Sequence, residues 1–474
     1  MIVTQSMRYL FPPCGPAVLV LALALAGCAV GPAYQRPDVA TPAAFKEGRG
    51  EWVKAVPADT LERGPWWELF NDPQLNQLAA QVEVSNQNVA AAVAAYAQAR
   101  ALVAQQRAGL FPAVSLDAGA NRSGSGSGGK TPAHSTYQIS IGGSWEPDVW
   151  GRLGRGVEGA QAGAQASLAD LRAATLSAQG ELATDYFNLR QSDAQIALQA
   201  QTIEGYQRSL RITQNRYNAG IVPRTDVLQA QTQLANAQAD QLGLERQRAV
   251  LEHAIAVLVG KAPADFNLAA RPTWEGIVPD VPFDVPSTLL QRRPDIAAAE
   301  RRAAQANEQI GIAEAAFFPS LQLSGSAGLG AASIGDLFKA SSLVWSLGAS
   351  LAQTVFDAGA TRARVESARA GLEQAAAHYR QTVLAAFQSV EDQLIASRIL
   401  QQQLVLRDQA AQAANLVEQQ VLNRYQAGQV NYTDVITAQV TAQSARRAVA
   451  QALSDRQVAA VALIQALGGG WRGF

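Results

Sequence analysis

The 474-residue chain has few of the side chains from which metal centres and disulfide frameworks are built. It contains two cysteines and three histidines, and only 16% of its residues are charged. These counts exclude a disulfide framework and leave too few ligands for a metal cluster. The 38 basic and 39 acidic side chains nearly cancel, so nothing favours a nucleic-acid partner. No phosphate-binding loop or nucleophile–base pair emerges, so an enzyme is disfavoured and no cofactor is expected.

The N-terminus has the features of an export signal. After Arg8, residues 17–26 form an apolar run of about 10 residues, which is too short to span a bilayer. Residues 25–28, Leu-Ala-Gly-Cys, are similar to the lipobox of bacterial lipoproteins. We therefore predict a signal peptide over 1–27 and a mature chain that begins at Cys28, with diacylglycerol on its sulfur and palmitate on its amino group. A plain signal peptide is the alternative. Ala29 favours delivery to the outer membrane, and translation could start at Met1 or Met7.

An internal duplication organises the rest of the chain. Residues 215–231 recur as 423–439, at an offset of 208 residues and with 11 of 17 positions identical. Two shorter matches have offsets of 208 and 207 residues, which indicates two structural copies rather than chance. The predicted organisation therefore has six parts: a signal peptide (1–27), a lipid-anchored segment (28–72), the first repeat (73–260), a linker (261–294), the second repeat (295–467) and a tail (468–474).

Each repeat is predicted to contain a helix, two strands, a very long helix, a turn and a last helix. Alanine makes up about a fifth of the chain and glutamine about a tenth, which favours long, closely packed helices. A seven-residue apolar repeat, which predicts coiled-coil packing, runs through Leu168, Thr175, Leu182, Leu189, Ile196, Ile203, Leu210 and Tyr217. As one helix, residues 153–217 would be about 98 Å long. A two-helix structural stalk is the alternative that this periodicity leaves open.

Four segments alternate apolar with small polar side chains, which argues against a simple stalk. They cover residues 114–121, 137–146, 321–329 and 345–351. Strands of about 10 residues with this alternation are typical of transmembrane strands around a wet lumen, and Trp145 and Trp345 suit an aromatic girdle. One chain supplies only four strands, and lipid tolerates no open sheet edge. Several copies must therefore share one sheet. A soluble sandwich would not lie between helices of coiled-coil length.

The whole mature chain resembles the TolC-like outer membrane factors, in their NodT-type efflux lipoprotein branch. The motifs behind this resemblance are Gly27-Cys28-Ala-Val-Gly-Pro-Ala-Tyr34-Gln-Arg-Pro37, Trp66-Trp67, Asp72-Pro73-Gln-Leu75, Leu290-Gln-Arg-Arg-Pro-Asp-Ile296 and Ala316-Phe-Phe-Pro319. The resemblance implies a mixed, mainly α homotrimer: long antiparallel coiled-coil helices form a trimeric α-barrel in the periplasm, and four strands per chain join a shared 12-stranded transmembrane β-barrel.

The resemblance also implies a function. Such proteins are passive ducts with no catalytic activity, which sit in outer-membrane lipid and export small molecules such as drugs or other toxic compounds. They dock to a periplasmic adaptor and an inner-membrane pump, for which the lipoprotein branch favours the resistance-nodulation-division type. An ABC-type or type I secretion exporter is the alternative. A trimeric coiled-coil adhesin is disfavoured, because it would not carry barrel strands twice in mid-chain.

The turns that end the two long helices are the candidate periplasmic tips. In each, an Arg-Tyr pair closes a helix, a glycine breaks it, and Thr-Asp opens the next helix. The predicted adaptor-docking residues are Arg216, Tyr217, Gly220, Val222, Thr225, Asp226, Arg424, Tyr425, Gly428, Val430, Thr433 and Asp434. Helix capping alone is the alternative role. Thr437 is the aperture candidate, and related sequences often have Asp there, so the constriction here would carry less charge.

Overall fold

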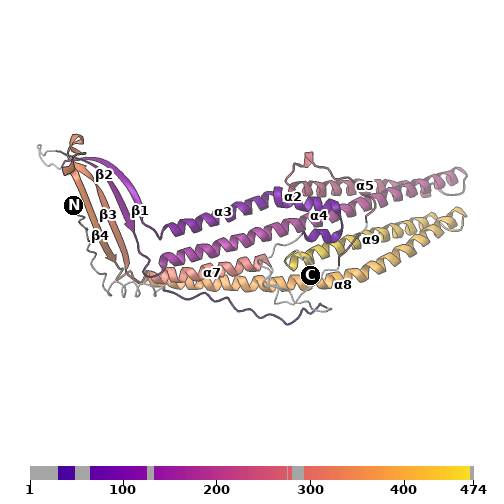
Figure 1. The fold of residues 1–474 in the computed structure, drawn as a ribbon. Helices are drawn as coiled ribbons and strands as arrows, with labels where there is room; N and C mark the ends of the chain where they lie inside the picture. Colours follow the sequence, from indigo (N-terminus) through magenta and orange to yellow (C-terminus); the bar gives the residue numbers. More distant parts are fainter. Residues whose placement is uncertain (1–29, 49–64, 125–132, 275, 280–292, 470–474) are drawn as a thin grey trace, which may run out of the picture. The chain divides into compact units, whose positions relative to one another are not determined.

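The computed structural model describes residues 30–48, 65–124, 133–274, 276–279 and 293–469 (Figure 1). The predicted signal peptide and Cys28 lie outside the described residues. The chain divides into two compact units: residues 1–37, 97–165 and 300–377 form the first, and residues 38–96, 166–299 and 378–474 form the second. None of the described helices is both long enough and apolar enough to cross a membrane.

Apart from α2, which has no counterpart within the described residues, the elements occur twice in the same order, as the duplication predicts. The first repeat contains α2 (Pro73–Ser85), α3 (Gln87–Ala108), β1 (Ala113–Ser123), β2 (His134–Trp145), α4 (Arg152–Asn218) and α5 (Arg224–Leu258). The second contains α7 (Pro294–Ala315), β3 (Ser320–Ala331), β4 (Leu343–Ala352), α8 (Ala360–Gln426) and α9 (Tyr432–Ala466). Helices α4 and α8 both have 67 residues, and α5 and α9 both have 35. The internal duplication is therefore confirmed in the structure.

Short one-turn helices lie outside these repeated elements. They are η1 (Trp66–Phe70), η2 (Pro263–Asp265), η3 (Ile334–Asp336) and η4 (Ala340–Ser342). The last two lie in the connection between β3 and β4.

The first unit contains one four-stranded antiparallel sheet in the order β1-β2-β3-β4. The pairing of β2 with β3 joins the two repeats. At this junction Gly328 lies opposite Ser140, and a Cβ at Gly328 would come 2.4 Å from the carbonyl oxygen of Ile139. Glycine is therefore required there, because any larger residue would push the two central strands apart.

Aspartates start the long helices. The carboxylate of Asp148 accepts hydrogen bonds from the amides of Leu153 (2.9 Å) and Gly154 (2.6 Å) at the start of α4. Asp357 accepts one from the amide of Thr361 (2.7 Å) at the start of α8. Such caps satisfy amides that have no partner within their own helix, so the same device fixes the strand-to-helix transition in both repeats.

The second unit has an aromatic-rich core. Trp66, Trp67 and Phe70 of η1 are all buried, and they pack with Leu75 of α2 and Phe187 of α4. The rings of Phe70 and Phe187 have their centroids 4.9 Å apart. The Trp66-Trp67 pair therefore serves the core, which explains why two tryptophans stand next to each other before the first repeat.

Helix α4 buries a different stripe from the one that its apolar repeat predicts. Leu182 and Leu189 are fully buried, but Ile196, Ile203 and Leu210 are only half-buried. The residues buried in this half of the helix are mostly polar: Gln199, Thr202, Tyr206, Ser209 and Thr213. Here α4 contacts both α5 and α9, because the side chain of Gln199 donates to the backbone of Ala237 (2.6 Å) and accepts from Gln443 (2.7 Å). A helix with two neighbours has two seams, and the polar seam contributes no apolar repeat to the sequence.

Candidate functional site

The sheet of the first unit exposes apolar side chains and has two free edges. Among the residues that the structure describes, strands β1 and β4 each pair on one side only, and all their residues are exposed. Leu347 is 81% exposed, and Leu116 and Leu351 are also exposed. On the other face of β4, the hydroxyl groups of Ser346 and Ser326 lie 2.9 Å apart. An edge strand with bare backbone groups and an apolar face is a surface that requires a partner.

The two tryptophans assigned to an aromatic girdle lie on one face of this sheet. Trp145 pairs with Leu323 of β3, and Trp345 pairs with Ala327, four positions further along the same strand. The indole of Trp145 donates a hydrogen bond to the carbonyl of Leu110 (2.9 Å), whereas Trp345 is 69% exposed. Their membrane role stays a prediction.

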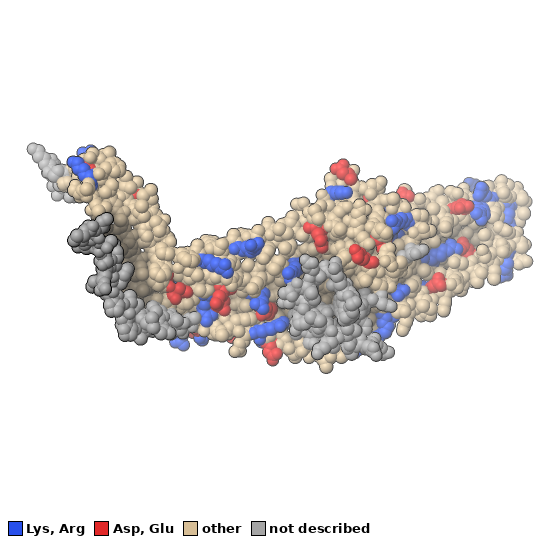
Figure 2. Space-filling model, in the orientation of Figure 1, with Lys and Arg blue, Asp and Glu red and all other residues tan. Residues whose placement is uncertain are grey.

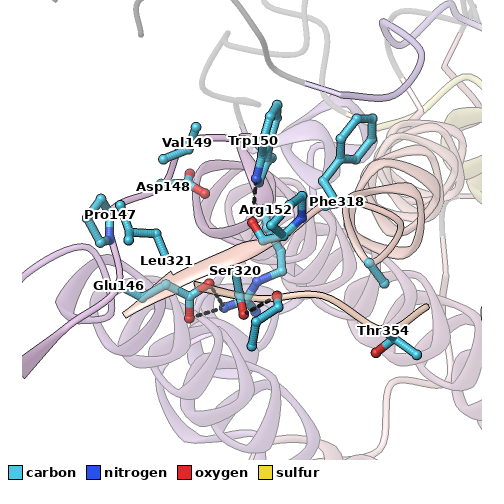
Figure 3. A pocket seen from close by; sticks show the side chains of 14 residues that line it. Glu146, Pro147, Asp148, Val149, Trp150, Arg152, Phe318, Ser320, Leu321 and Thr354 are labelled. Carbon is cyan, nitrogen blue, oxygen red and sulfur yellow. Dashed lines mark hydrogen bonds and ion pairs between the residues drawn. The ribbon is translucent and has the colours of Figure 1, made fainter. Parts of the chain in front are cut away.

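A cavity of about 150 Å³ lies where the strands of the first unit meet its helices (Figure 3). Arg152 donates two hydrogen bonds of 2.8 Å to the carboxylate of Glu146. The indole of Trp150 donates to the carbonyl of Pro319 (2.7 Å), and its ring stacks on Phe318 at 4.7 Å. Asp148 is used as the cap of α4. The charged side chains lining this cavity are therefore all engaged, and their contacts join the strands to the helices without leaving a reactive group free.

The segment that follows Cys28 is fastened to the same unit. The amide of Val30 donates to the carbonyl of Trp150 (3.1 Å). Arg155 of α4 donates to the carbonyls of Gly31 (3.0 Å) and Pro32 (3.3 Å) and to the carboxylate of Glu308 (2.7 Å). Sequence reasoning found the Gly-Pro-x-Tyr motif here but not its partners, because Arg155 and Glu308 lie far away in the chain.

Close backbone contact explains the glycine of that motif. Gly31 has a φ of +110°, and a Cβ on it would lie 2.5 Å from the Cα of Gly311. The hydroxyl of Tyr34 then donates to the carboxylate of Glu300 (2.7 Å). Only glycines at both positions allow the segment to cross α7 this closely.

The two helix-pair turns of the second unit have the same backbone geometry. Gly220 and Gly428 have φ values of 72° and 75°. At the first turn, the amide of Gly220 donates to Tyr217 (2.9 Å) and that of Ile221 to Arg216 (2.9 Å). Gly428 and Gln429 make the corresponding bonds of 3.0 and 2.8 Å at the second turn. Both are left-handed Schellman stops, for which glycine has no steric penalty.

The helices that follow the turns begin differently. Asn431 and Asp434 form a reciprocal capping box at the start of α9. Pro223 occupies the equivalent position before α5, and no side chain caps that helix. Capping therefore accounts for Asp434 but not for Asp226.

The predicted tip residues differ widely in exposure. Exposed are Tyr217, Gly220, Thr225, Arg424, Gly428, Thr433, Asp434 and the aperture candidate Thr437; half-buried are Arg216, Val222, Asp226 and Val430; Tyr425 is buried. Tyr425 packs with Ala230, Tyr432 and Val435 in a small cluster that joins the two turns. Tyr432 is buried in this cluster, whereas its equivalent in the first repeat, Arg224, is exposed. Figure 2 shows charged side chains scattered over a largely uncharged surface.

Comparison with known proteins identifies the family. A model described as outer membrane efflux protein matches residues 75–261 and 285–469. The toluene efflux pump outer membrane protein TtgC of Pseudomonas putida is 30% identical over 96% of this chain and 95% of its own length. The cation efflux system protein CusC of Escherichia coli is 27% identical over 97% of this chain and 100% of its own. The structure of the outer-membrane channel OprN aligns with a TM-score of 0.84 at 31% identity, over 94% of this chain and 100% of that one.

The family match spans both repeats, and the chain shares the fold of the solved channel OprN. Within the described residues, no group of His, Cys, Asp and Glu side chains is placed to hold a metal ion. The family match shows that the protein belongs to the outer membrane efflux protein family: it is a passive efflux channel of the outer membrane that extends into the periplasm, and not an enzyme.

Proposed function

We propose that three copies of this chain form one duct across the outer membrane. The duct works with a periplasmic adaptor and an inner-membrane pump of the resistance-nodulation-division type. The observation that supports this most strongly is the sheet with two free edges. In hydrocarbon, each unpaired amide or carbonyl costs several kcal/mol, so a single copy is not stable there.

The strand order also favours closure between copies. Neighbouring strands alternate in direction from β1 to β4, so β1 and β4 run in opposite directions. Placing β4 of one copy beside β1 of the next therefore continues an antiparallel sheet without a break. The polar face with Ser326 and Ser346 would line the lumen, and the face with Leu347 would contact lipid.

The exported molecules are small, and the duct itself does not select among them. The names of relatives at 27–30% identity refer to cargoes as different as cations and toluene. The charged groups around the cavity of the first unit are already engaged, Arg152 with Glu146 and Asp148 with backbone amides of α4, so they do not form a cargo site. We assign cargo selection to the pump.

The duct is anchored by lipid on Cys28. The segment from Val30 to Tyr34, which begins two residues after Cys28, supports this anchor. Its hydrogen bonds hold it beside the junction between the strands and helices of the first unit. The mature protein purified from outer membranes is expected to begin at Cys28 and to carry the mass of three acyl chains, whereas Cys28→Ser is expected to lose them. A mature protein of unmodified mass that begins at another residue would contradict the anchor.

The turns at Gly220 and Gly428 are the mouth that docks the adaptor, and Thr437 lies near the aperture. Both glycines are exposed and left-handed, so Gly220→Val together with Gly428→Val should deform the turns without touching a core. In cells that lack the native gene, wild type is expected to restore ethidium export and the double variant to restore less than a tenth of it. The trimer should persist in both.

The matched control is Gly243→Val on α5. Gly243 is exposed, and a Cβ there would meet no atom within 4 Å. This variant should export ethidium like wild type. Full export by the double variant would refute docking at the turns, and loss of export by the control would show that valine substitution itself is harmful.

A further inference from the structure

A second cavity, of about 280 Å³, lies within the second unit. Its apolar walls are Phe70 of η1, Phe187 of α4, and Trp274 and Ile277 of the segment that follows α5. The rings of Phe70 and Phe187 are buried, and Trp274 is half-buried. Small-molecule sites begin at about 300 Å³, so this cavity has room for one ring-sized ligand rather than a long chain. None of the residues assigned above to the duct, its anchor or its mouth lines it.

Gln457 of α9 gives this cavity a buried acceptor without a partner. Its side chain is 2% exposed, and its amide nitrogen donates to the carbonyl of Ile277 (2.9 Å). That bond fixes which end of the amide is nitrogen, so the oxygen Oε1 points elsewhere. Among the described residues this oxygen accepts no hydrogen bond. A buried acceptor without a donor is destabilising, and a bound ligand that donates to it removes that cost.

The repeated helices do not require this polar group. The residue at the same place in the other repeat, its twin, is Ala249 for Gln457 and Ile395 for Phe187, at the offset of 208 residues. Small and aliphatic side chains therefore serve the same helix positions in the other repeat. The buried amide and the aromatic ring of the cavity are features of this one place in the chain, and the architecture of the duct does not explain them.

The exposed end of the cavity carries both signs of charge. The carboxylate of Asp72 accepts from the hydroxyl of Tyr186 (2.6 Å) and, at 3.4 Å, from the guanidinium of Arg271, whose side chain is 46% exposed. An ammonium group on a ligand would be repelled by Arg271, and a carboxylate by Asp72, so this end favours a neutral ligand. The exposed hydroxyl of Thr273 beside them both donates and accepts hydrogen bonds.

We propose that this cavity binds the pyranose ring of a neutral sugar. The apolar face of the ring is removed from water against Trp274, and one of its hydroxyl groups donates to Oε1 of Gln457. Hydroxyl groups donate and accept at once, so the same ring also accepts from Arg271 and bonds to Thr273. A flat aromatic molecule would fill the space but leave these polar groups unpaired. The ring is either a free sugar or the terminal unit of a glycan, and the inference does not depend on the trimer.

Calorimetric titration of the purified protein tests the proposal. The detergent is lauryldimethylamine oxide, so that no detergent headgroup is itself a sugar. Glucose and N-acetylglucosamine are titrated separately, and at least one is expected to show saturable binding. Gln457→Leu removes the acceptor and is expected to weaken that binding about tenfold, the usual cost of one lost hydrogen bond to a buried group. Heats of dilution alone for both sugars would overturn the proposal.

Two further variants separate binding from packing. Thr273 is exposed, so Thr273→Trp should block the cavity without entering the core and should abolish sugar binding even if Gln457→Leu fails to fold. The matched control is Gln451→Leu, which changes an exposed glutamine of the same helix outside the cavity and should bind like wild type. Unchanged binding in both Gln457→Leu and Thr273→Trp would place the sugar elsewhere and overturn the proposal.

The length of the sugar distinguishes its two sources. The trisaccharide of whichever sugar binds, maltotriose or chitotriose, is compared with the single sugar. Equal affinities would support a site for a free sugar, whereas tighter binding of the trisaccharide would support a site for the end of a glycan. Ethidium is the probe for the opposite outcome: binding of ethidium that Thr273→Trp abolishes, without binding of either sugar, would assign the cavity to aromatic cations and refute the sugar site.

Discussion

Asp193→Asn is expected to destabilise the second unit by about 3–5 kcal/mol, the usual cost of removing one partner from a buried ion pair. Asp193 and Arg190 are one turn apart on α4, and their side chains are 1% and 0% exposed. The carboxylate accepts from Arg190 (2.6 Å) and from Arg248 of α5 (2.7 Å). Without it, Arg190 keeps its charge in a site that water does not reach. Its other acceptors, the carbonyl of Ala269 and the side chain of Gln74, are neutral.

The loss of stability in Asp193→Asn should extend to the segment that follows α5. Asp193 accepts from the backbone amide of Arg271 (3.0 Å), and Arg190 donates to Ala269, so this ion pair holds residues 269–271 against the helices. We expect the temperature of trimer dissociation in detergent to fall by several degrees, and trypsin to cut near Arg271 sooner. The control is Glu204→Gln, which breaks the exposed Arg208–Glu204 pair on the same helix and should cost less than about 1 kcal/mol. Equal dissociation temperatures for Asp193→Asn and Glu204→Gln would contradict the stabilising role of the buried Asp193–Arg190 pair.

Leu347→Arg is expected to reduce the assembled trimer in outer membranes to a small fraction of the wild-type amount. Leu347 lies midway along β4, opposite Gly325, and is 81% exposed. An arginine on the lipid face near the bilayer midplane costs about 2–4 kcal/mol. A trimer carries this cost in each of its copies, so assembly should suffer far more than the folding of the helical unit.

Ser346→Arg is the matched control for this prediction. Ser346 precedes Leu347 on the same strand, and its hydroxyl contacts that of Ser326 on the other face of the sheet. If that face lines a wet lumen, an arginine there stays hydrated and the trimer should form normally. The measurement is the amount of heat-dissociable trimer in the outer-membrane fraction for both variants. Similar yields would show that the two faces do not differ in environment.

Much of the secondary structure can be predicted from local patterns in the sequence. The predicted long helix over 153–217 is α4 within one residue at each end, because glycine and aspartate set its two ends. The four strands were predictable because alternation places every second side chain on one face. The offset of 208 residues further predicted that whatever forms in one repeat forms again in the other. These features depend on neighbours within a few residues, so a single sequence is sufficient to locate them.

Other features follow only from contacts between distant segments. The apolar repeat predicted the seam of α4 at Leu182 and Leu189, yet the seam beside α9 is polar. The hydrogen bonds of Arg155 to Glu308 and to the backbone of residues 31–32 join positions more than 120 residues apart in the sequence. Nothing in the local pattern distinguishes Tyr425, which is buried under Arg216, from its twin Tyr217, which is exposed.

The sequence by itself therefore determined which segments are helix, strand and turn, that they occur twice, and that the strands of one chain are too few to stand alone in lipid. Only the tertiary structure decided which twin of each repeated residue is buried, which charges share the Asp193 network, and where the segment after Cys28 is fastened. The physical reason is that periodicity and capping act between residues close along the chain. Burial and ion pairing, in contrast, depend on which distant surfaces meet, and two identical motifs acquire different neighbours as soon as they pack side by side.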